Sequence, residues 1–195
     1  MARKIEYSKS NALTQATKLF LRKGYEATPM DELVKATGIN RHSMYKEFGD
    51  KEGLFLACIK HYTLEQRNLK TVEILTQKPL GIKNVEAFLQ DRVDYALCDD
   101  CYGCLLVNMI TEREVVSQKV NDKIDRILTN QENLIFKCIE AAIEGGQISK
   151  DNDSRLVTDY LSCFFKGLMN MARNPNKNKC SLKKMGFMAL TSIER

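Results

Sequence analysis

Long hydrophobic runs are absent from this 195-residue sequence: no apolar stretch approaches the roughly 18–20 residues that a membrane-spanning helix requires. The opening residues, MARKIEYSKS, are basic, but no apolar segment follows them to form the centre of a secretory signal peptide. These absences argue against a membrane protein and an exported one. We therefore expect a cytoplasmic protein without a membrane partner.

Runs of alternating apolar and polar residues, which would indicate β-strands, are also missing, as are internal repeats and low-complexity tracts. Histidine is scarce, with only His42 and His61 in the chain. An enzyme with a cysteine nucleophile needs a partner base, and His42 belongs to the basic half of the sequence. We therefore expect no enzymatic activity and no catalytic residues.

The residues that are present suit an ordinary globular protein, with 44% hydrophobic and 28% charged side chains. The net charge of +5 is unevenly distributed. Residues 1–70 contain 13 Lys and Arg against 8 Asp and Glu, whereas residues 71–195 contain 17 of each kind. Two explanations fit this excess of positive charge equally well: a basic face that is merely solvated, or an N-terminal part that binds a polyanion.

Apolar residues recur at helical spacing through nearly the whole chain, which predicts an all-α fold of eight or nine helices. Glycine and capping residues mark boundaries in the first part: an end at Gly24, a start at Thr28–Pro29, an end at Gly38, and starts at Asn40 and Asp50. The helix from Asp50 is expected to continue to about Leu75. Later helices are expected near residues 85–97, 120–143, 153–174 and 182–193.

Two of these helices are short and are joined through TGIN, within the stretch TPMDELVKATGINRHSMYKEF (residues 28–48). This arrangement matches a helix-turn-helix, in which the N-terminal residues of the second helix lie at base edges in the major groove. Arg41 can form the paired hydrogen bonds to guanine, and His42 and Ser43 can reach bases or phosphates. Helix–glycine–helix turns also occur in all-α proteins that bind no DNA.

The predicted DNA-contacting set extends to positions suited to phosphate. The Thr28 hydroxyl and the free backbone N–H groups near it, at a helix N-terminus, are typical phosphate ligands. The set comprises Thr28, Pro29, Asn40, Arg41, His42, Ser43, Tyr45, Lys46 and Lys51.

The stretch ALTQATKLFLRKGYEATPMDELVKATGINRHSMYKEFGDKEGLF (residues 12–55) resembles the N-terminal domain of the TetR family of bacterial transcriptional regulators. The matching features are KGYEAT, MDEL, ATGI, SMYKEF and DKEGL, and together they cover roughly residues 8–60. The resemblance implies a homodimer that binds a palindromic double-stranded DNA operator. It also implies a larger all-α C-terminal domain for ligand binding and dimerisation.

By the same resemblance, the recognition helix spans about residues 40–47, with Arg41, His42 and Ser43 facing bases. Tyr45 matches a tyrosine that supports phosphate binding, and Lys51 matches a lysine at the start of the fourth helix. Glu47 departs from the family pattern, because histidine is frequent at its position. A carboxylate is repelled by phosphate, so Glu47 either points away from DNA or accepts a hydrogen bond from cytosine.

The motif CDDCYGC places Cys98, Cys101 and Cys104 at C-x2-C-x2-C spacing. Four hypotheses remain open: thiols that only pack, a thiol that senses oxidants or electrophiles, a zinc site, and an iron–sulfur cluster. The zinc site lacks an obvious fourth ligand, although Asp99 or Asp100 could serve. Asn108 stands where the fourth cysteine of a ferredoxin motif would fall. We expect reduced thiols and no bound cofactor, with zinc as the minority alternative.

Cys104 is the preferred sensor of the three. Asp99 and Asp100 oppose a thiolate at their neighbours, whereas Cys104 follows Gly103 at the predicted start of a helix, whose dipole favours a thiolate. The segment GCLLVN resembles a subgroup of the TetR family in which Gly-Cys opens the sixth helix. Some members of that subgroup respond to electrophiles.

The resemblance also implies a ligand pocket among the C-terminal helices. Candidate lining residues are Tyr62, Phe88, Arg92, Tyr95, Met109, Phe136 and Phe164, although each aromatic residue or methionine fits an ordinary core equally well. Arg92 is the most suggestive, because a guanidinium on an apolar stretch needs an anionic partner when it is buried. The last two helices are expected to form the dimer interface, using Leu161, Phe165, Leu168, Met185 and Met188.

The sequence thus predicts a helix-turn-helix DNA-binding domain in residues 1–50 and an all-α regulatory and dimerisation domain in residues 51–195. We expect a repressor that a small-molecule inducer or an electrophile releases from its operator. The alternative hypothesis is a metal- or redox-sensing protein that uses Cys98, Cys101 and Cys104.

Overall fold

The computed structural model describes residues 9–192, apart from the side chains of residues 66 and 67. Its α-helices are, in chain order, α1 (Lys9–Lys23), α2 (Met30–Thr37), α3 (Arg41–Phe48), α4 (Lys51–Thr63), α5 (Gln66–Thr76), α6 (Ile82–Leu97), α7 (Leu105–Asn108), α8 (Gln118–Glu144), α9 (Ser154–Ala172) and α10 (Lys179–Thr191). Two 3₁₀ helices, η1 (Met109–Thr111) and η2 (Arg113–Val115), follow α7. The all-α prediction is confirmed, since the described range contains no strand.

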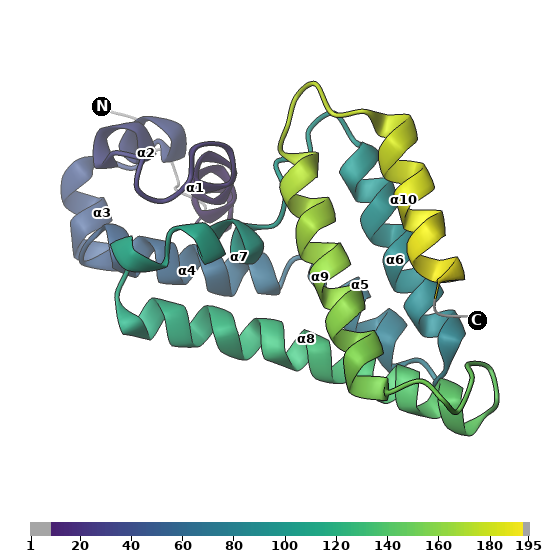
Figure 1. Ribbon diagram of the computed structural model, residues 1–195. Coiled ribbons are helices and arrows are strands. Elements are labelled where there is room, and N and C mark those ends of the chain that lie inside the picture. Colours follow the sequence, from purple (N-terminus) through teal and green to yellow (C-terminus); the bar gives the residue numbers. More distant parts are fainter. Residues whose placement is uncertain (1–8, 193–195) are drawn as a thin grey trace.

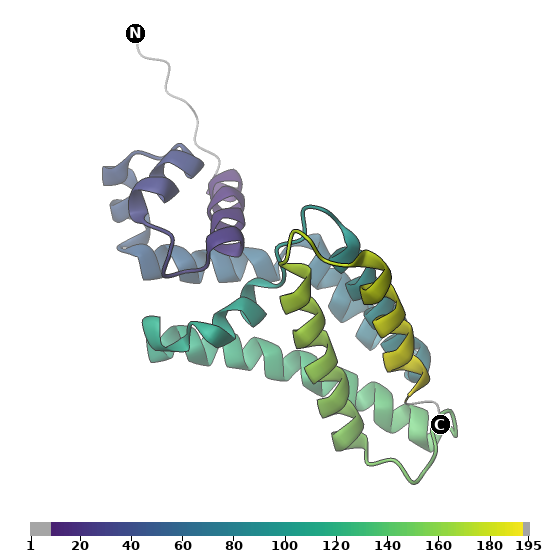
Figure 2. The same cartoon turned by 45° about the horizontal axis from the view of Figure 1, so that its top comes forward.

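The helices form a small cluster and a larger one. Helices α1, α2 and α3 gather at one end of the molecule, and α6, α9 and α10 stand together at the other (Figure 1). The long helix α8 extends from beneath the small cluster to the far end of the large one, as a second view also shows (Figure 2). No helix within residues 9–192 is both long and apolar enough to cross a membrane.

Each cluster has its own aromatic centre. In the small cluster, the ring of Phe20 lies 4.8 Å from that of Phe55 and 5.9 Å from that of Tyr25, and all three rings are buried. In the large cluster, the rings of Phe88 and Phe165 lie 5.6 Å apart. Because Phe55 belongs to α4, this helix closes the core of the small cluster before it continues toward the large one.

The helix predicted from Asp50 to about Leu75 is in fact two helices, and this prediction was wrong. Helix α4 ends where the backbone N–H of Leu64 bonds to the carbonyl of His61 (3.0 Å), and the Asn68 side chain donates to the carbonyl of Tyr62. The sequence between α4 and α5 contains no glycine or proline. The break arises from packing, because α4 lies on α1 whereas α5 lies on α6 and α8.

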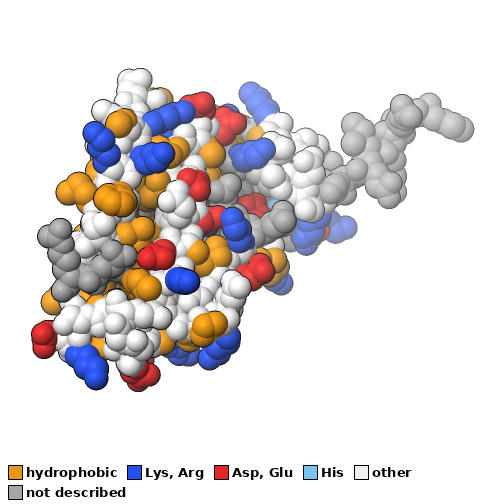
Figure 3. All heavy atoms as spheres, turned by 90° about the vertical axis from the view of Figure 1, so that its right-hand side faces the viewer, with side chains coloured by type: hydrophobic (Ala, Val, Ile, Leu, Met, Phe, Trp, Pro, Cys, Tyr) orange, Lys and Arg blue, Asp and Glu red, His pale blue; other side chains and the backbone are white. Residues whose placement is uncertain are grey.

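The predicted dimer residues are also placed differently. Leu161, Phe165 and Leu168 are buried in the protomer, Met185 is half-buried, and only Met188 is exposed. The large apolar side chains that α9 and α10 expose are Leu156, Tyr160, Met171, Phe187 and Met188. The side of the molecule that carries α10 shows hydrophobic side chains between charged ones (Figure 3).

Candidate nucleic-acid interface and regulatory cavities

The turn between α2 and α3 is fixed by its backbone. Gly38 has a φ of 71°, a left-handed conformation that favours glycine, and its N–H bonds to the carbonyl of Val34 (3.1 Å). Two residues later the Asn40 side chain accepts a hydrogen bond from the backbone N–H of Ser43 (2.8 Å) and caps α3. The local sequence therefore sets both the end of α2 and the start of α3.

One side of α3 anchors it and the other is free. Met44 of α3 and Leu33 of α2 are both fully buried, and Ile39 of the turn is 5% exposed. The side chains of residues 41–43, at the first turn of α3, are all exposed, as are those of Tyr45 and Lys46. The arrangement presents hydrogen-bonding groups on a rigid helix tip, which is the geometry that base recognition in the major groove requires.

The charged residues of this tip are paired loosely. Arg41 lies 3.0 Å from Asp31 of α2, and both side chains are more than half exposed. An exposed ion pair of this kind contributes little, so Arg41 can leave Asp31 for a base edge at small cost. Glu47 points to α1, where its carboxylate accepts a hydrogen bond from Lys9 (2.5 Å). This contact supports the alternative in which Glu47 points away from DNA.

Thr28 does not lie where the sequence predicted. Its side chain is fully buried, and its hydroxyl donates to the carbonyl of Gly24 (2.6 Å), so this hydroxyl closes a turn and is not presented to a phosphate. Helix α2 begins at Met30, with Pro29 as N-cap and no side-chain capping hydrogen bond. Thr28 was therefore wrongly predicted as the capping residue of this helix, because its hydroxyl bonds to Gly24 and not to the first turn of α2.

Lys51, at the start of α4, joins several parts of this region. Its ammonium group donates to the carbonyl of Glu26 (3.3 Å) and lies 4.4 Å from the centre of the Tyr25 ring. Desolvation by burial lowers the pKa of Lys51, although Glu112 and Glu26 act in the opposite direction. Lys51 therefore holds the loop before α2 in place as well as presenting positive charge.

Two polar links connect the small cluster to the large one. The backbone N–H of Glu26 donates to the Glu112 carboxylate (2.9 Å), which follows η1. The backbone N–H and hydroxyl of Ser117, at the start of α8, donate to the Glu52 carboxylate (3.1 and 2.5 Å). Movement of α8 or of the segment before it is therefore coupled to the loop before α2 and to α4.

The three clustered cysteines are not gathered into one site. Cys98 is exposed, Cys101 and Cys104 are buried, and residues 9–192 contain no group of three or more potential metal ligands. The arrangement thus gives no support to the zinc and iron–sulfur hypotheses. Cys104 precedes α7, which is a single turn, so the helix dipole expected there is weak. The Tyr62 hydroxyl lies within hydrogen-bonding distance of the Cys104 sulfur (3.6 Å).

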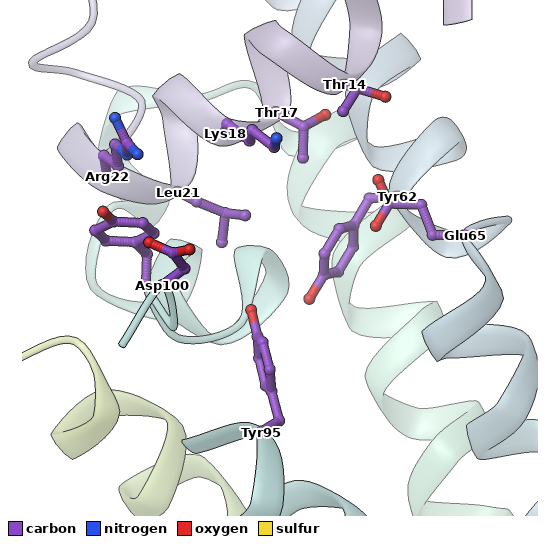
Figure 4. Close-up of a pocket in the computed structure, with 10 residues that line it drawn as sticks. Thr14, Thr17, Lys18, Leu21, Arg22, Tyr62, Glu65, Tyr95 and Asp100 are labelled. Atoms are coloured by element: carbon purple, nitrogen blue, oxygen red, sulfur yellow. The ribbon is translucent and has the colours of Figure 1, made fainter. Parts of the chain in front are cut away.

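A first cavity, the junction cavity, lies between α1 and the large cluster and has a volume of about 280 Å³. It is lined by Thr14, Thr17, Lys18, Leu21, Arg22, Tyr62, Glu65, Tyr95, Asp100 and Tyr102. The hydroxyls of Tyr62 and Tyr95 point into the space below α1 (Figure 4). Burial, and then the neighbouring Cys104, raise the pKa of Tyr62 well above its usual value, so this phenol stays protonated.

A second cavity, the Arg92 cavity, lies between α5, α6, α7, α8 and α9 and has a volume of about 210 Å³. It is lined by Thr63, Asn68, Thr71, Val72, Arg92, Cys104, Leu106, Ile127, Leu128, Asn130, Gln131, Leu134 and Phe165. Arg92 is 5% exposed, and its Nε has no hydrogen-bond partner among the described residues. A buried donor left unpaired costs about 1–3 kcal/mol, so this atom is a candidate ligand contact.

The predicted pocket residues are divided between different places. Tyr62 and Tyr95 line the junction cavity, and Arg92 lines the second. Phe88 and Met109 are core residues, and Phe136 and Phe164 are half-buried and line neither cavity. The neighbouring Phe165 lines the Arg92 cavity instead of Phe164. Asn130 and Gln131 also line the Arg92 cavity but were not predicted from the sequence. Their amides interrupt the apolar stripe of α8, and this interruption could have indicated a cavity.

Two family descriptions match this chain. Residues 12–58 match "Bacterial regulatory proteins, tetR family", and residues 81–181 match "Tetracyclin repressor-like, C-terminal domain". The first match covers the helix-turn-helix, and the second covers most of the large cluster. The first match thus runs from within α1 into α4, and the second runs from the start of α6 to the first turn of α10.

Individual proteins agree with this assignment. The chain is 27% identical over 194 residues to the HTH-type transcriptional repressor ComR of Escherichia coli K12, covering 96% of this chain and 88% of ComR. Its fold is similar to that of a cysteine mutant of the TetR family regulator CifR complexed with operator DNA (TM-score 0.82, 23% identity, 96% and 97% of the two chains). It is also similar to reduced Escherichia coli NemR (TM-score 0.74, 17% identity, 94% and 93%). The chain belongs to the TetR family and is a DNA-binding transcriptional regulator rather than an enzyme.

Proposed function

We propose that two copies of this protein bind one palindromic operator and repress transcription until a signal in the large cluster releases them. The observation that carries this proposal is the first turn of α3, where Arg41, His42 and Ser43 are exposed on a helix anchored by the fully buried Met44. ComR is a repressor, and the CifR mutant was solved with operator DNA, which supports the same role for this chain.

The roles within the interface follow from position. Arg41, His42 and Ser43 contact base edges, with Asn40 capping the helix that carries them. Tyr45, Lys46 and Lys51 contact phosphates, and Pro29 places the N-terminus of α2 at the DNA backbone. Residues 1–50 form the DNA-binding domain, and residues 51–195 form the regulatory and dimerisation domain.

The dimer interface is assigned to α9 and α10. Tyr160 of α9 and Ser192, just beyond α10, are linked by their hydroxyls (3.2 Å), so the two exposed apolar faces adjoin. Side chains such as Phe187 (68% exposed) and Met188 (65% exposed) are covered when two copies pair through these faces. Two α3 helices must then lie about 34–36 Å apart to read successive major grooves.

The signal acts through Cys104 or through a ligand beside it. Cys104 is 8% exposed but is among the residues that line the Arg92 cavity, through which we expect small molecules to reach it. The Tyr62 hydroxyl lies 3.6 Å from the Cys104 sulfur and fixes the position of this side chain. Cys101 is buried and Cys98 is exposed without lining this cavity, so both rank below Cys104 as sensors.

Arg41→Ala is expected to cost about 1–3 kcal/mol at one base-pair position and to relax specificity there, because it removes a base contact. Lys51→Ala should weaken binding to all sequences alike and reduce the salt dependence by about one phosphate contact. Fluorescence anisotropy with the operator and its single-base variants measures both. Lys137→Ala, an exposed charge on α8, is the matched control. Identical profiles for the two test variants would contradict the division of roles.

The response of Cys104 to an electrophile can be measured separately once the three exposed cysteines are replaced. In a background with Cys98, Cys163 and Cys180 changed to serine, N-ethylmaleimide should still release operator DNA. The Cys104 thiolate adds to the C=C bond, and the neighbouring carbon takes a proton from water. Adding Cys104→Ser should abolish release, which gel-shift titration and mass spectrometry would follow together. Undiminished release after that change rules out Cys104 as the sensor.

A further inference from the structure

Arg92 gives its cavity a positively charged side chain whose counter-ion, Asp91, is shared with a second cation. Arg92 is the only charged side chain among the described residues that line the cavity. Its Nη2 pairs with Asp91, and the same carboxylate also accepts a hydrogen bond from Lys70 at 2.6 Å. Burial would raise the pKa of Asp91, but the hydrogen bonds from Lys70 and Arg92 outweigh burial and lower it. The Asp91 carboxylate is thus shared between two cations and is not the counter-ion of Arg92 alone.

The guanidinium is also incompletely hydrogen-bonded. Arg92 is 5% exposed, and its Nε is buried without a partner among the described residues. The Nη2 group of the guanidinium is held by its hydrogen bond to Asp91. The Phe88 ring lies beside the guanidinium, with its centre 5.8 Å from the Arg92 Cζ. A guanidinium held in this way is ready to donate to a planar anion with little loss of side-chain freedom.

The remaining walls indicate what is attached to the anion. Leu106, Leu134 and Phe165 provide apolar surface, while the amides of Asn130 and Gln131 lie on α8. Val72 and Asn130 are both exposed and mark the mouth between α5 and α8. The volume of about 210 Å³ equals about seven water molecules at ~30 Å³ each and lies below the ~300–1,000 Å³ of drug-sized sites.

We propose that the Arg92 cavity binds a small monocarboxylate with a short apolar body, and that this anion is the regulatory ligand. The carboxylate accepts from Arg92, including its unpaired Nε, and the apolar body packs against Leu134 and Phe165. This inference rests on the proposed function, in that it names the ligand class of the regulatory domain. A cation would be repelled, and a neutral amide would satisfy the donor without neutralising the charge.

The direct test is calorimetric titration of the full chain with benzoate and hexanoate as probes, and with benzamide and hexanamide as neutral counterparts. The proposal expects saturable binding of at least one carboxylate and binding of its amide at least tenfold weaker. Binding of the amides as tight as that of the acids would overturn it, as would no binding of either acid at millimolar concentration.

Variants place the anion at Arg92. Arg92→Met should weaken carboxylate binding by about ten- to a hundred-fold, and Arg92→Lys should restore part of it because the charge is kept. Arg126→Met removes the same charge from an exposed site on α8 and should leave the affinity unchanged. An equal loss in Arg126→Met, or none in Arg92→Met, would contradict the assignment.

A second measurement needs no change at Arg92. Since Cys104 lines the same cavity, bound carboxylate should slow its alkylation by N-ethylmaleimide at least severalfold in the background lacking the exposed cysteines. Binding without protection would place the ligand elsewhere. Operator binding is measured on the same preparations. If the protein binds DNA but no carboxylate, only this inference is contradicted. If it binds carboxylate but no DNA, the proposed function is contradicted.

Discussion

Replacing Phe187 and Met188 together by aspartate is expected to convert the dimer to monomers and to weaken operator binding by about 10²–10⁴-fold. Both side chains are about two-thirds exposed in the protomer, so the protomer itself should remain folded. A charge placed in an apolar interface must be desolvated without a partner, which opposes pairing. The loss at the operator is large because a second half-site bound from the same particle benefits from a high effective concentration.

Analytical ultracentrifugation and anisotropy titration measure the two effects on the same samples. Leu64→Asp with Leu69→Asp is the matched control, since these side chains are also large, apolar and exposed but lie on α5 and just before it. The control should remain dimeric and bind DNA normally. A double α10 variant that stays dimeric and binds with wild-type affinity would show that the copies pair through another face.

Gly53→Ala is expected to destabilise the protein by about 2 kcal/mol, or roughly 4–8 °C in melting temperature, and to reduce operator affinity at least tenfold. A Cβ at Gly53 would lie 1.9 Å from the carbonyl oxygen of Phe48, the last residue of α3. Backbone cannot yield as a flexible side chain does, so α3 must shift relative to α4. The recognition helix would then be misaligned with the groove that it reads.

Calorimetry and operator titration test this expectation. Thr129→Ala is the comparison, because Thr129 is exposed within α8 and alanine is the better helix former. It should melt at or above the wild-type temperature. If Gly53→Ala also melts within a degree of wild type and retains operator affinity, the close packing of α3 on α4 is not required.

The N-terminal helices could be predicted well because their signals are local. Asn40 caps α3 and Gly38 takes the left-handed conformation, and both effects depend on neighbouring residues only. The Thr28 prediction was wrong although the sequence pattern was present, because the hydroxyl found a buried carbonyl in the folded chain. Local patterns determine where a helix can begin, whereas tertiary contacts determine which of the possible partners is used.

The C-terminal helices were less predictable for the same physical reason. No residue near Leu64 forbids a continuous helix, and the break exists because α4 and α5 pack on different neighbours. Phe164 and Phe165 both fit the apolar stripe of α9, and only the packing with Phe88 shows which one reaches the cavity. Arg92 was identifiable because a buried guanidinium is unusual in any context.

The most direct test of whether the α3 helices of two copies bind one DNA duplex is hydroxyl-radical footprinting on genomic fragments that this protein selects. Two protected patches related by two-fold symmetry should lie on one face of the duplex, with centres about 10–10.5 base pairs apart or a multiple of that. Arg41→Ala should relax selection at one base pair in each half-site while leaving the protection at low salt. A single unpaired patch, or no protection even in dilute buffer, would contradict the account.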